Sequence, residues 1–144
     1  MDERVARLAT PEACEQFAIN VEERGKPELA LAARRRAVEL RAAAHGASTV
    51  AEREALQAVY AYERVLSTRH GRKTRASRTW QMIERRGIIP VVEHVVTRTA
   101  ESTGYTALVQ MGMQDMAFEA VVLRHPDVFS AEAVPRSKER LEAL

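Results

Sequence analysis

The part of the sequence with the clearest chemical character is the basic stretch between residues 69 and 78. Half of its ten residues are Arg or Lys, and no Asp or Glu occurs between Glu63 and Glu84. Guanidinium groups bind phosphate oxygens bidentately, and a cluster of cations can neutralise several phosphates of a polyanion. The cations are Arg69, Arg72, Lys73, Arg75 and Arg78. This stretch predicts contact with an anionic partner such as nucleic acid, with DNA favoured over RNA.

Two neighbouring features fit such a partner. The basic stretch leads into the start of a predicted helix, where unpaired backbone N–H groups and the helix dipole favour a phosphate. Trp80 is the only tryptophan of the chain, and its ring could stack on a base. A sole tryptophan in a helical domain with few aromatic residues is usually a core anchor, and this is the stronger of the two interpretations of Trp80. For the basic stretch, binding and simple solvation are equally weighted alternatives.

The two segments that flank Gly87 have the layout of a helix-turn-helix motif, in which a glycine lies in the turn. The second segment would present residues 89–96 to a groove, and only Glu93 and His94 among them are polar. Base readout needs several donors and acceptors near the start of the helix. A buried core helix explains this segment better, so we assign the predicted nucleic-acid contact to the basic stretch.

The sequence predicts no catalytic residue, metal site or cofactor. Its four histidines are spread along the chain without neighbouring ligands at metal-binding spacing, and no glycine-rich phosphate loop is present. The spacing of Arg64 and His70 resembles the R-x(4–6)-H catalytic motif of the all-helical HEPN ribonucleases. The resemblance implies that Arg64 orients the scissile phosphate and that His70 assists the attacking hydroxyl. About 1.5 such spacings arise by chance in this composition, so a metal-independent ribonuclease is the third hypothesis.

The later part of the chain is acidic and suggests the second hypothesis, a protein-interaction module. Its acids are Glu101, Asp115, Glu119, Asp127 and Glu132, against a single base, Arg124. The basic stretch would dock an acidic protein partner, or this acidic region of a second copy, which would give a homo-oligomer. Asp115 and Glu119 are four residues apart on a predicted helix, which is typical of a solvated edge.

Composition indicates one globular domain over residues 1–144. Hydrophobic residues make up 46% of the chain and charged residues 29%, so a core is possible without cross-links. The single cysteine, Cys14, excludes an internal disulfide, and its position on the apolar side of a predicted helix indicates a buried thiol. No run of 18 apolar residues and no apolar leader at the N-terminus are found, so we expect no membrane span and a cytoplasmic location.

Apolar spacing predicts an all-α fold of about six or seven helices. A three-helix unit is expected over residues 10–70, with a smaller helical cluster over residues 74–144. Thr10 and Pro11 begin the first helix and Gly25 ends it. The second helix covers residues 27–45. The third opens with a capping box at Thr49 and Glu52 and stops before Gly71.

The helices of the second half are shorter and less sharply bounded. Thr74 or Ser77 is expected to cap a helix that ends at Arg86. Residues 88–96 have helical apolar spacing, with a strand as the alternative. Further helical segments are predicted from Tyr105 to Gln110, from Met113 to about His125, and from Pro135 to Leu144, with Ser130 capping a turn before the last one.

Overall fold

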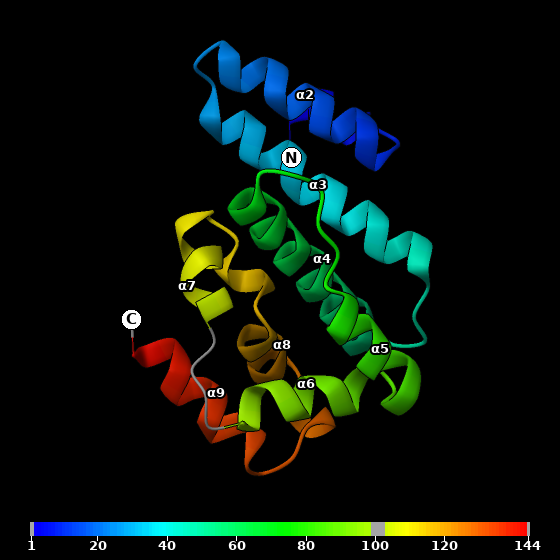
Figure 1. Ribbon diagram of the computed structural model, residues 1–144, viewed down its shortest axis with the longest axis vertical. Helices are drawn as coiled ribbons and strands as arrows, with labels where there is room; N and C mark the ends of the chain where they lie inside the picture. Colours follow the sequence, from blue (N-terminus) through cyan, green and yellow to red (C-terminus); the bar gives the residue numbers. More distant parts are fainter. Residues whose placement is uncertain (1, 99–102, 144) are drawn as a thin grey trace. The chain divides into compact units, whose positions relative to one another are not determined.

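The computed structural model describes residues 2–98 and 103–143, and all regular secondary structure within them is helical (Figure 1). The all-α prediction is confirmed, although these residues form nine α-helices instead of six or seven. One of the additional helices is α1 (Glu3–Ala6), which Asp2 caps by accepting a 2.8 Å hydrogen bond from the Arg4 amide. A helix of one turn is too short to show apolar periodicity, so the sequence did not reveal it.

The chain forms two compact units, residues 1–46 and residues 47–144. The boundary lies after Gly46, whereas the sequence suggested a three-helix unit that extended to residue 70. The long helix after Thr49 therefore clusters with the C-terminal helices. Apolar spacing identifies the face that a helix buries, but it does not identify the helices that cover that face.

The first unit contains α1, α2 (Pro11–Glu23) and α3 (Pro27–His45). Thr10 caps α2 as predicted, because its Oγ1 accepts a 3.1 Å hydrogen bond from the Ala13 amide. Its apolar cluster consists mainly of small residues: Val5, Ala18, Val21, Ala30 and Ala33. Small side chains allow the antiparallel pair α2 and α3 to approach closely.

Cys14 is fully buried in α2, as the sequence indicated. Burial raises the pKa of its thiol, which opposes formation of the reactive thiolate. Two arginines of α3 form ion pairs with glutamates of α2. Arg34 lies 2.7 Å from Glu22, and Arg41 lies 3.4 Å from Glu15. The charge of these two arginines is therefore compensated by acids of the same unit.

The second unit is built around α4 (Val50–His70), which packs against α6, α7 and α8. Thr49 begins α4 by accepting a 3.1 Å hydrogen bond from the Glu52 amide. The Glu52 carboxylate in turn accepts hydrogen bonds from the Ser48 amide at 3.2 Å and from the Thr49 hydroxyl at 3.3 Å. The helix ends at Gly71, whose φ of 69° is a left-handed conformation that glycine adopts without strain.

The remaining elements are short helical segments that follow α4 in the chain (Figure 1). They are α5 (Ser77–Arg86), α6 (Ile88–Thr97), α7 (Thr103–Gln110), the 3-10 helices η1 (Gln114–Met116) and η2 (Pro126–Val128), α8 (Phe118–Arg124) and α9 (Ala133–Glu142). The helical interpretation of residues 88–96 is confirmed, and four valines of α6 are buried. Valines from α6 and α8, together with Phe129, Ala133 and two alanines of α4, form one core cluster of this unit.

The single helix predicted from Met113 to His125 is interrupted. Gly112 has a φ of 71°, and the Met113 amide donates to the Leu108 carbonyl at 2.8 Å, which closes the end of α7. A 3-10 turn then follows, and Ala117 is extended before α8 begins. A 3-10 turn repeats every three residues, so Met113 and Met116 are both buried, as they would also be on an α-helix. The apolar pattern therefore could not separate the two structures.

None of the helices in the described part of the chain is both long enough and apolar enough to span a bilayer.

Candidate functional site

The basic segment, residues 69–78, runs from the last two residues of α4 to the first two of α5 and is held to α4 by hydrogen bonds. The Ser67 hydroxyl accepts from the Thr74 amide at 2.8 Å and donates to the Thr74 carbonyl at 3.4 Å. The Thr74 hydroxyl in turn donates to the Arg72 carbonyl at 2.9 Å. These hydrogen bonds use backbone groups of Arg72 and Thr74 and involve none of the cationic side chains of the segment.

Glu63 of α4 fixes the start of α5. Its Oε2 accepts a 2.9 Å hydrogen bond from the Ala76 amide and a 2.7 Å bond from the Trp80 indole nitrogen. The prediction that Thr74 or Ser77 caps this helix is wrong, because Ala76 occupies the N-cap position and has no side-chain cap. Glu63 is distant in sequence, so the local cap pattern could not indicate it.

Trp80 is placed as an anchor between α5 and α4. Its ring lies 5.1 Å from the Tyr60 ring at an angle of 55°, and the Arg75 guanidinium lies 5.8 Å from its centroid. The indole is partly buried, and its N–H group is bonded to Glu63. These contacts favour the anchoring interpretation of Trp80 over base stacking.

The cations of the basic segment remain exposed. Within residues 2–98 and 103–143, no carboxylate partner is found for Arg69, Arg72, Lys73 or Arg78. Arg75 approaches Glu63 with 3.7 Å between Nε and Oε2, and its side chain is still 66% exposed. The protein's own acids therefore neutralise little of this positive charge.

Beside the basic segment, the second unit contains a cavity of about 950 Å³. Its wall is formed by parts of α4, the basic segment, α5, α6, α7 and the start of α8. Four arginines line it: Arg75, Arg78, Arg85 and Arg98. Two of them belong to the predicted cations, whereas Arg69, Arg72, Lys73 and Trp80 are not part of the wall.

Arg85 and Arg98 were not selected from the sequence. Arg78 and Arg85 are seven residues apart and so share one face of α5, which is a signal that the sequence did contain. Arg98 immediately follows α6, far from the basic segment in sequence, and only tertiary packing brings it to the same cavity. The structure thus gathers cations from two separate parts of the chain.

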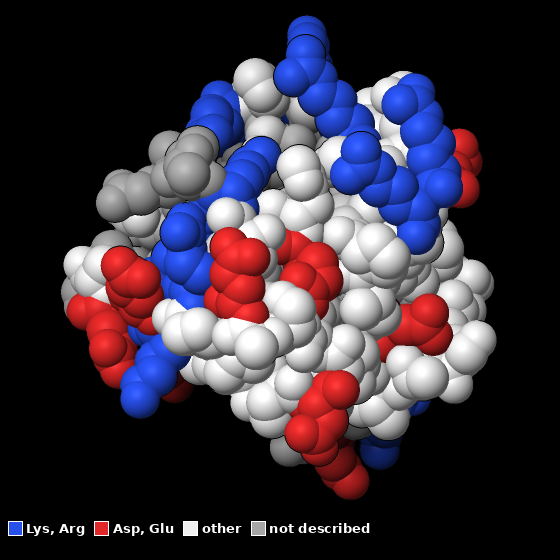
Figure 2. Space-filling view, turned by 90° about the horizontal axis from the view of Figure 1, so that it is seen from below, with Lys and Arg blue, Asp and Glu red and all other residues white. Residues whose placement is uncertain are grey.

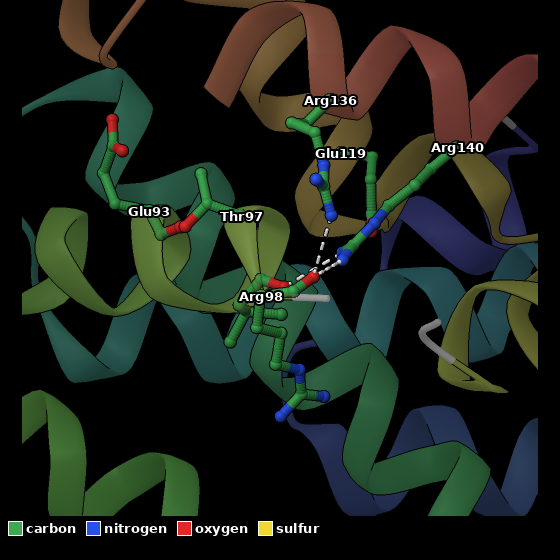
Figure 3. A network of polar contacts seen from close by, with 7 residues as sticks. Glu93, Thr97, Arg98, Glu119, Arg136 and Arg140 are labelled. Atoms are coloured by element: carbon green, nitrogen blue, oxygen red, sulfur yellow. Dashed lines mark hydrogen bonds and ion pairs between the residues drawn. The ribbon is translucent and has the colours of Figure 1, made fainter. Parts of the chain in front are cut away.

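The backbone of Arg98 has a different role from its side chain (Figure 3). Its carbonyl, at the C-terminal end of α6, accepts hydrogen bonds from Arg136 at 3.1 Å and from Arg140. Cations suit this end of a helix because the dipole is negative there. The guanidinium of Arg98 extends away from this network in Figure 3 and remains exposed.

The carboxylate that lines the cavity, Glu119, already has a cationic partner. It is 2% exposed, and its Oε2 lies 3.2 Å from a guanidinium nitrogen of Arg140. The same Arg140 nitrogen donates to the Val95 carbonyl at 2.9 Å. The expectation that Glu119 lies on a solvated edge is therefore wrong, and the four lining arginines face no unneutralised carboxylate in the described wall.

The acidic region that was expected to dock a second copy is smaller than its sequence indicates. Glu101 lies outside the described residues, and Glu119 is buried, which leaves Asp115, Asp127 and Glu132 exposed. On the face drawn in Figure 2, basic side chains are more concentrated in the upper half and acidic side chains in the lower half. Charges of the two signs are partly segregated on this face.

The ribonuclease hypothesis gains little from the geometry. His70 lines the cavity but Arg64 does not, so the two residues are not presented to a common ligand there. Among the described residues, no group of three His, Cys, Asp or Glu side chains could hold a metal ion. The cavity can offer guanidinium and imidazole hydrogen bonds to an anion.

Comparison with known proteins adds no assignment: no family model, no curated protein and no solved structure matches this chain.

Proposed function

We propose that the protein binds nucleic acid without catalysis, through the basic segment and the adjoining arginine-lined cavity, with DNA as the first ligand to test. One observation is the main support for the proposal. Arg78, Arg85 and Arg98 line one cavity, and no carboxylate partner for them occurs in the described residues.

Such a cluster of cations is electrostatically unfavourable unless an external anion compensates it. Guanidinium groups match phosphate oxygens because they offer planar, bidentate donors. The exposed side chains of Arg69, Arg72 and Lys73 extend the positive charge beyond the cavity. A polyanion that spans both places would make more contacts than a small anion could.

A mobility-shift titration tests this proposal with duplex DNA, single-stranded DNA and RNA at 50 and 200 mM salt. Contact with about five phosphates should weaken binding a few hundredfold between these salt concentrations. Binding that is absent at both concentrations for all three ligands would overturn the proposal.

The triple variant Arg69→Glu, Arg72→Glu, Lys73→Glu should lose most of this affinity. These side chains have no ion pair in the described structure, so their replacement should leave the helical circular dichroism spectrum unchanged. The matched control reverses three exposed cations elsewhere: Arg24→Glu, Lys26→Glu, Arg53→Glu. Equal losses in both variants would indicate a general effect of net charge and not a binding segment.

Sedimentation at several protein concentrations separates the alternative of self-association. The present proposal predicts the same mass at each concentration in the absence of nucleic acid. A mass that rises with concentration, together with no mobility shift, would favour docking between copies instead.

A further inference from the structure

The cavity has the size of a small-ligand site. Its volume of about 950 Å³ lies at the upper end of the range of about 300–1,000 Å³ that is typical of such sites. A base-paired segment cannot enter a space of this size, but one nucleotide can. The cavity is therefore suited to a single unit of a strand, whereas the cations of the basic segment outside it can follow the backbone: Arg69, Arg72 and Lys73.

The wall combines two kinds of chemistry. Guanidinium groups of Arg78 and Arg85 come from one face of α5, and Arg98 adds a third from the end of α6. Apolar and aromatic side chains form the other part of the wall: Tyr62, Leu66, Met82, Tyr105, Leu108 and Phe118. A ligand that fits both parts must carry a concentrated negative charge next to a planar, largely apolar group.

The first turn of α5 adds to the anion-binding side. Ser77, Arg78 and Thr79 line the cavity, and their amides have no hydrogen-bond partner within the described chain. Amides at the start of a helix and its dipole both attract negative charge. Glu63 occupies only the Ala76 amide at this helix start, so the amides of the next three residues stay available.

The number of cations indicates which phosphate suits the cavity. An internal phosphodiester carries one negative charge, whereas a phosphomonoester carries about 1.5 to 2 at neutral pH. Arg75 has Glu63 as a partner, but the other three lining arginines still exceed what one diester can neutralise, and Arg140 already neutralises Glu119. A terminal phosphomonoester provides the better match.

We propose that this cavity receives the phosphorylated terminal nucleotide of a single strand, with the phosphate against Arg78, Arg85 and Arg98 and the base against the aromatic part of the wall. This inference rests on the proposed nucleic-acid binding and specifies its ligand. It also assigns binding roles to Arg85 and Arg98, which lie outside the basic segment.

Fluorescence anisotropy of the full chain with a labelled single-stranded ten-nucleotide DNA tests the inference. The same sequence is used with a 5′-phosphate, with a 3′-phosphate, or with hydroxyls at both ends. At least one phosphorylated form should bind about tenfold more tightly than the hydroxyl form. The two phosphorylated forms distinguish which end of the strand enters.

Neighbouring arginines of α5 provide a matched pair of variants. Arg85→Gln should abolish the advantage of the phosphorylated end, and Arg98→Gln should do the same independently. Arg86→Gln should preserve the advantage, because Arg86 is exposed and does not line the cavity. Arg72→Gln with Lys73→Gln should weaken all three oligonucleotides by a similar factor and leave their ratio unchanged.

The outcomes separate this inference from the broader proposal. Equal, salt-dependent binding of all three oligonucleotides would overturn the terminal-phosphate inference and leave nucleic-acid binding intact. An advantage that persists in both Arg85→Gln and Arg98→Gln would also overturn it. No binding of any oligonucleotide would overturn both.

Discussion

Glu63 is the residue on which the geometry of the basic segment depends most. One carboxylate oxygen holds the Ala76 amide at the start of α5 and the Trp80 indole at the following turn. The side chain is 15% exposed, so neither donor would find full solvation if the carboxylate were removed. Buried donors that lose their acceptor destabilise a fold more than the mean net contribution of a hydrogen bond suggests.

Glu63→Ala should therefore lower the free energy of unfolding by about 1–3 kcal/mol. Trp80 is the only tryptophan, so its emission reports this site alone, and it should shift to longer wavelength as the indole becomes more hydrated. Urea unfolding followed by fluorescence measures both effects. Glu84→Ala removes an exposed carboxylate of the same region and serves as the control. Unchanged stability and emission in Glu63→Ala would contradict the anchoring role.

For individual residues, the sequence predicted which side chains are exposed better than it predicted their hydrogen-bond and ion-pair partners. The exposure of Arg69, Arg72 and Lys73 follows directly from their charge. The partners of Glu63 and of Glu119 lie at distant positions in the chain, so no local spacing could identify them. The sequence favoured Trp80 as an anchor, but it could not identify Glu63 as the partner of the indole for the same reason.

Among the helices, α4 and α8 are joined by an ionic contact at one carboxylate. Glu54 of α4 lies 2.6 Å from the Arg124 Nε and 3.1 Å from the His125 Nε2. Burial by itself would raise the pKa of Glu54, but the contacts with Arg124 and His125 outweigh it and hold that pKa below its usual value of 4.5. The folded state therefore favours the ionised carboxylate.

A lowered carboxyl pKa stabilises the fold above the unfolded pKa of about 4.5, and this stabilisation is lost as the pH falls through the lower folded value. We expect Glu54→Gln to reduce the free energy of unfolding by about 1 kcal/mol at pH 7. The difference from the unmodified chain should shrink as the pH falls below about 4.5. Urea unfolding between pH 3 and 7 measures it.

Asp127→Asn provides the control for this pH dependence. Asp127 is exposed near the end of α8, and no polar contact of its side chain occurs in the described structure. Its replacement should change stability little at any pH in this range. A difference for Glu54→Gln that stays constant down to pH 3 would contradict the ionic contribution of Glu54.

Element boundaries were predictable where capping residues are local. Thr10 and Thr49 begin α2 and α4 as expected, and Gly71 ends α4. The α9 helix begins at Ala133, two residues before the expected Pro135, and the Ser130 hydroxyl accepts from the Ala133 amide at 3.1 Å. Prediction failed where a cap comes from another helix, as at α5, or where a 3-10 turn has the same apolar spacing as an α-helix.

For the whole molecule, the sequence predicted a cluster of charge but not the cavity. Five cations of the basic segment are visible in the sequence, whereas the cavity also needs Arg98 from the end of α6 and aromatic residues from α4, α7 and α8. These segments come together only through tertiary packing, in which α6, α7 and α8 all contact α4. A site assembled from several helices leaves no contiguous motif, which is why Arg98 was missed, whereas the helical spacing of Arg78 and Arg85 was visible in the sequence.

The division of the chain into two units leads to a prediction about its parts. The core cluster of α4, α6 and α8, the basic segment and the cavity all lie within residues 47–144. The capping residues Thr49 and Glu52 of α4 lie there as well. A fragment of residues 47–144 should therefore fold and bind nucleic acid within about twofold of the full chain.

Residues 1–46 should be only marginally stable alone, because a chain of about this length buries too little apolar surface. Their apolar cluster includes three alanines and no aromatic residue among its buried members. Circular dichroism during thermal unfolding should show a cooperative transition for residues 47–144 and a weak, gradual one for residues 1–46. Oligonucleotide titrations of both fragments complete the test. A folded 47–144 fragment that binds ten times more weakly than the full chain would show that the first unit contributes to the nucleic-acid interface.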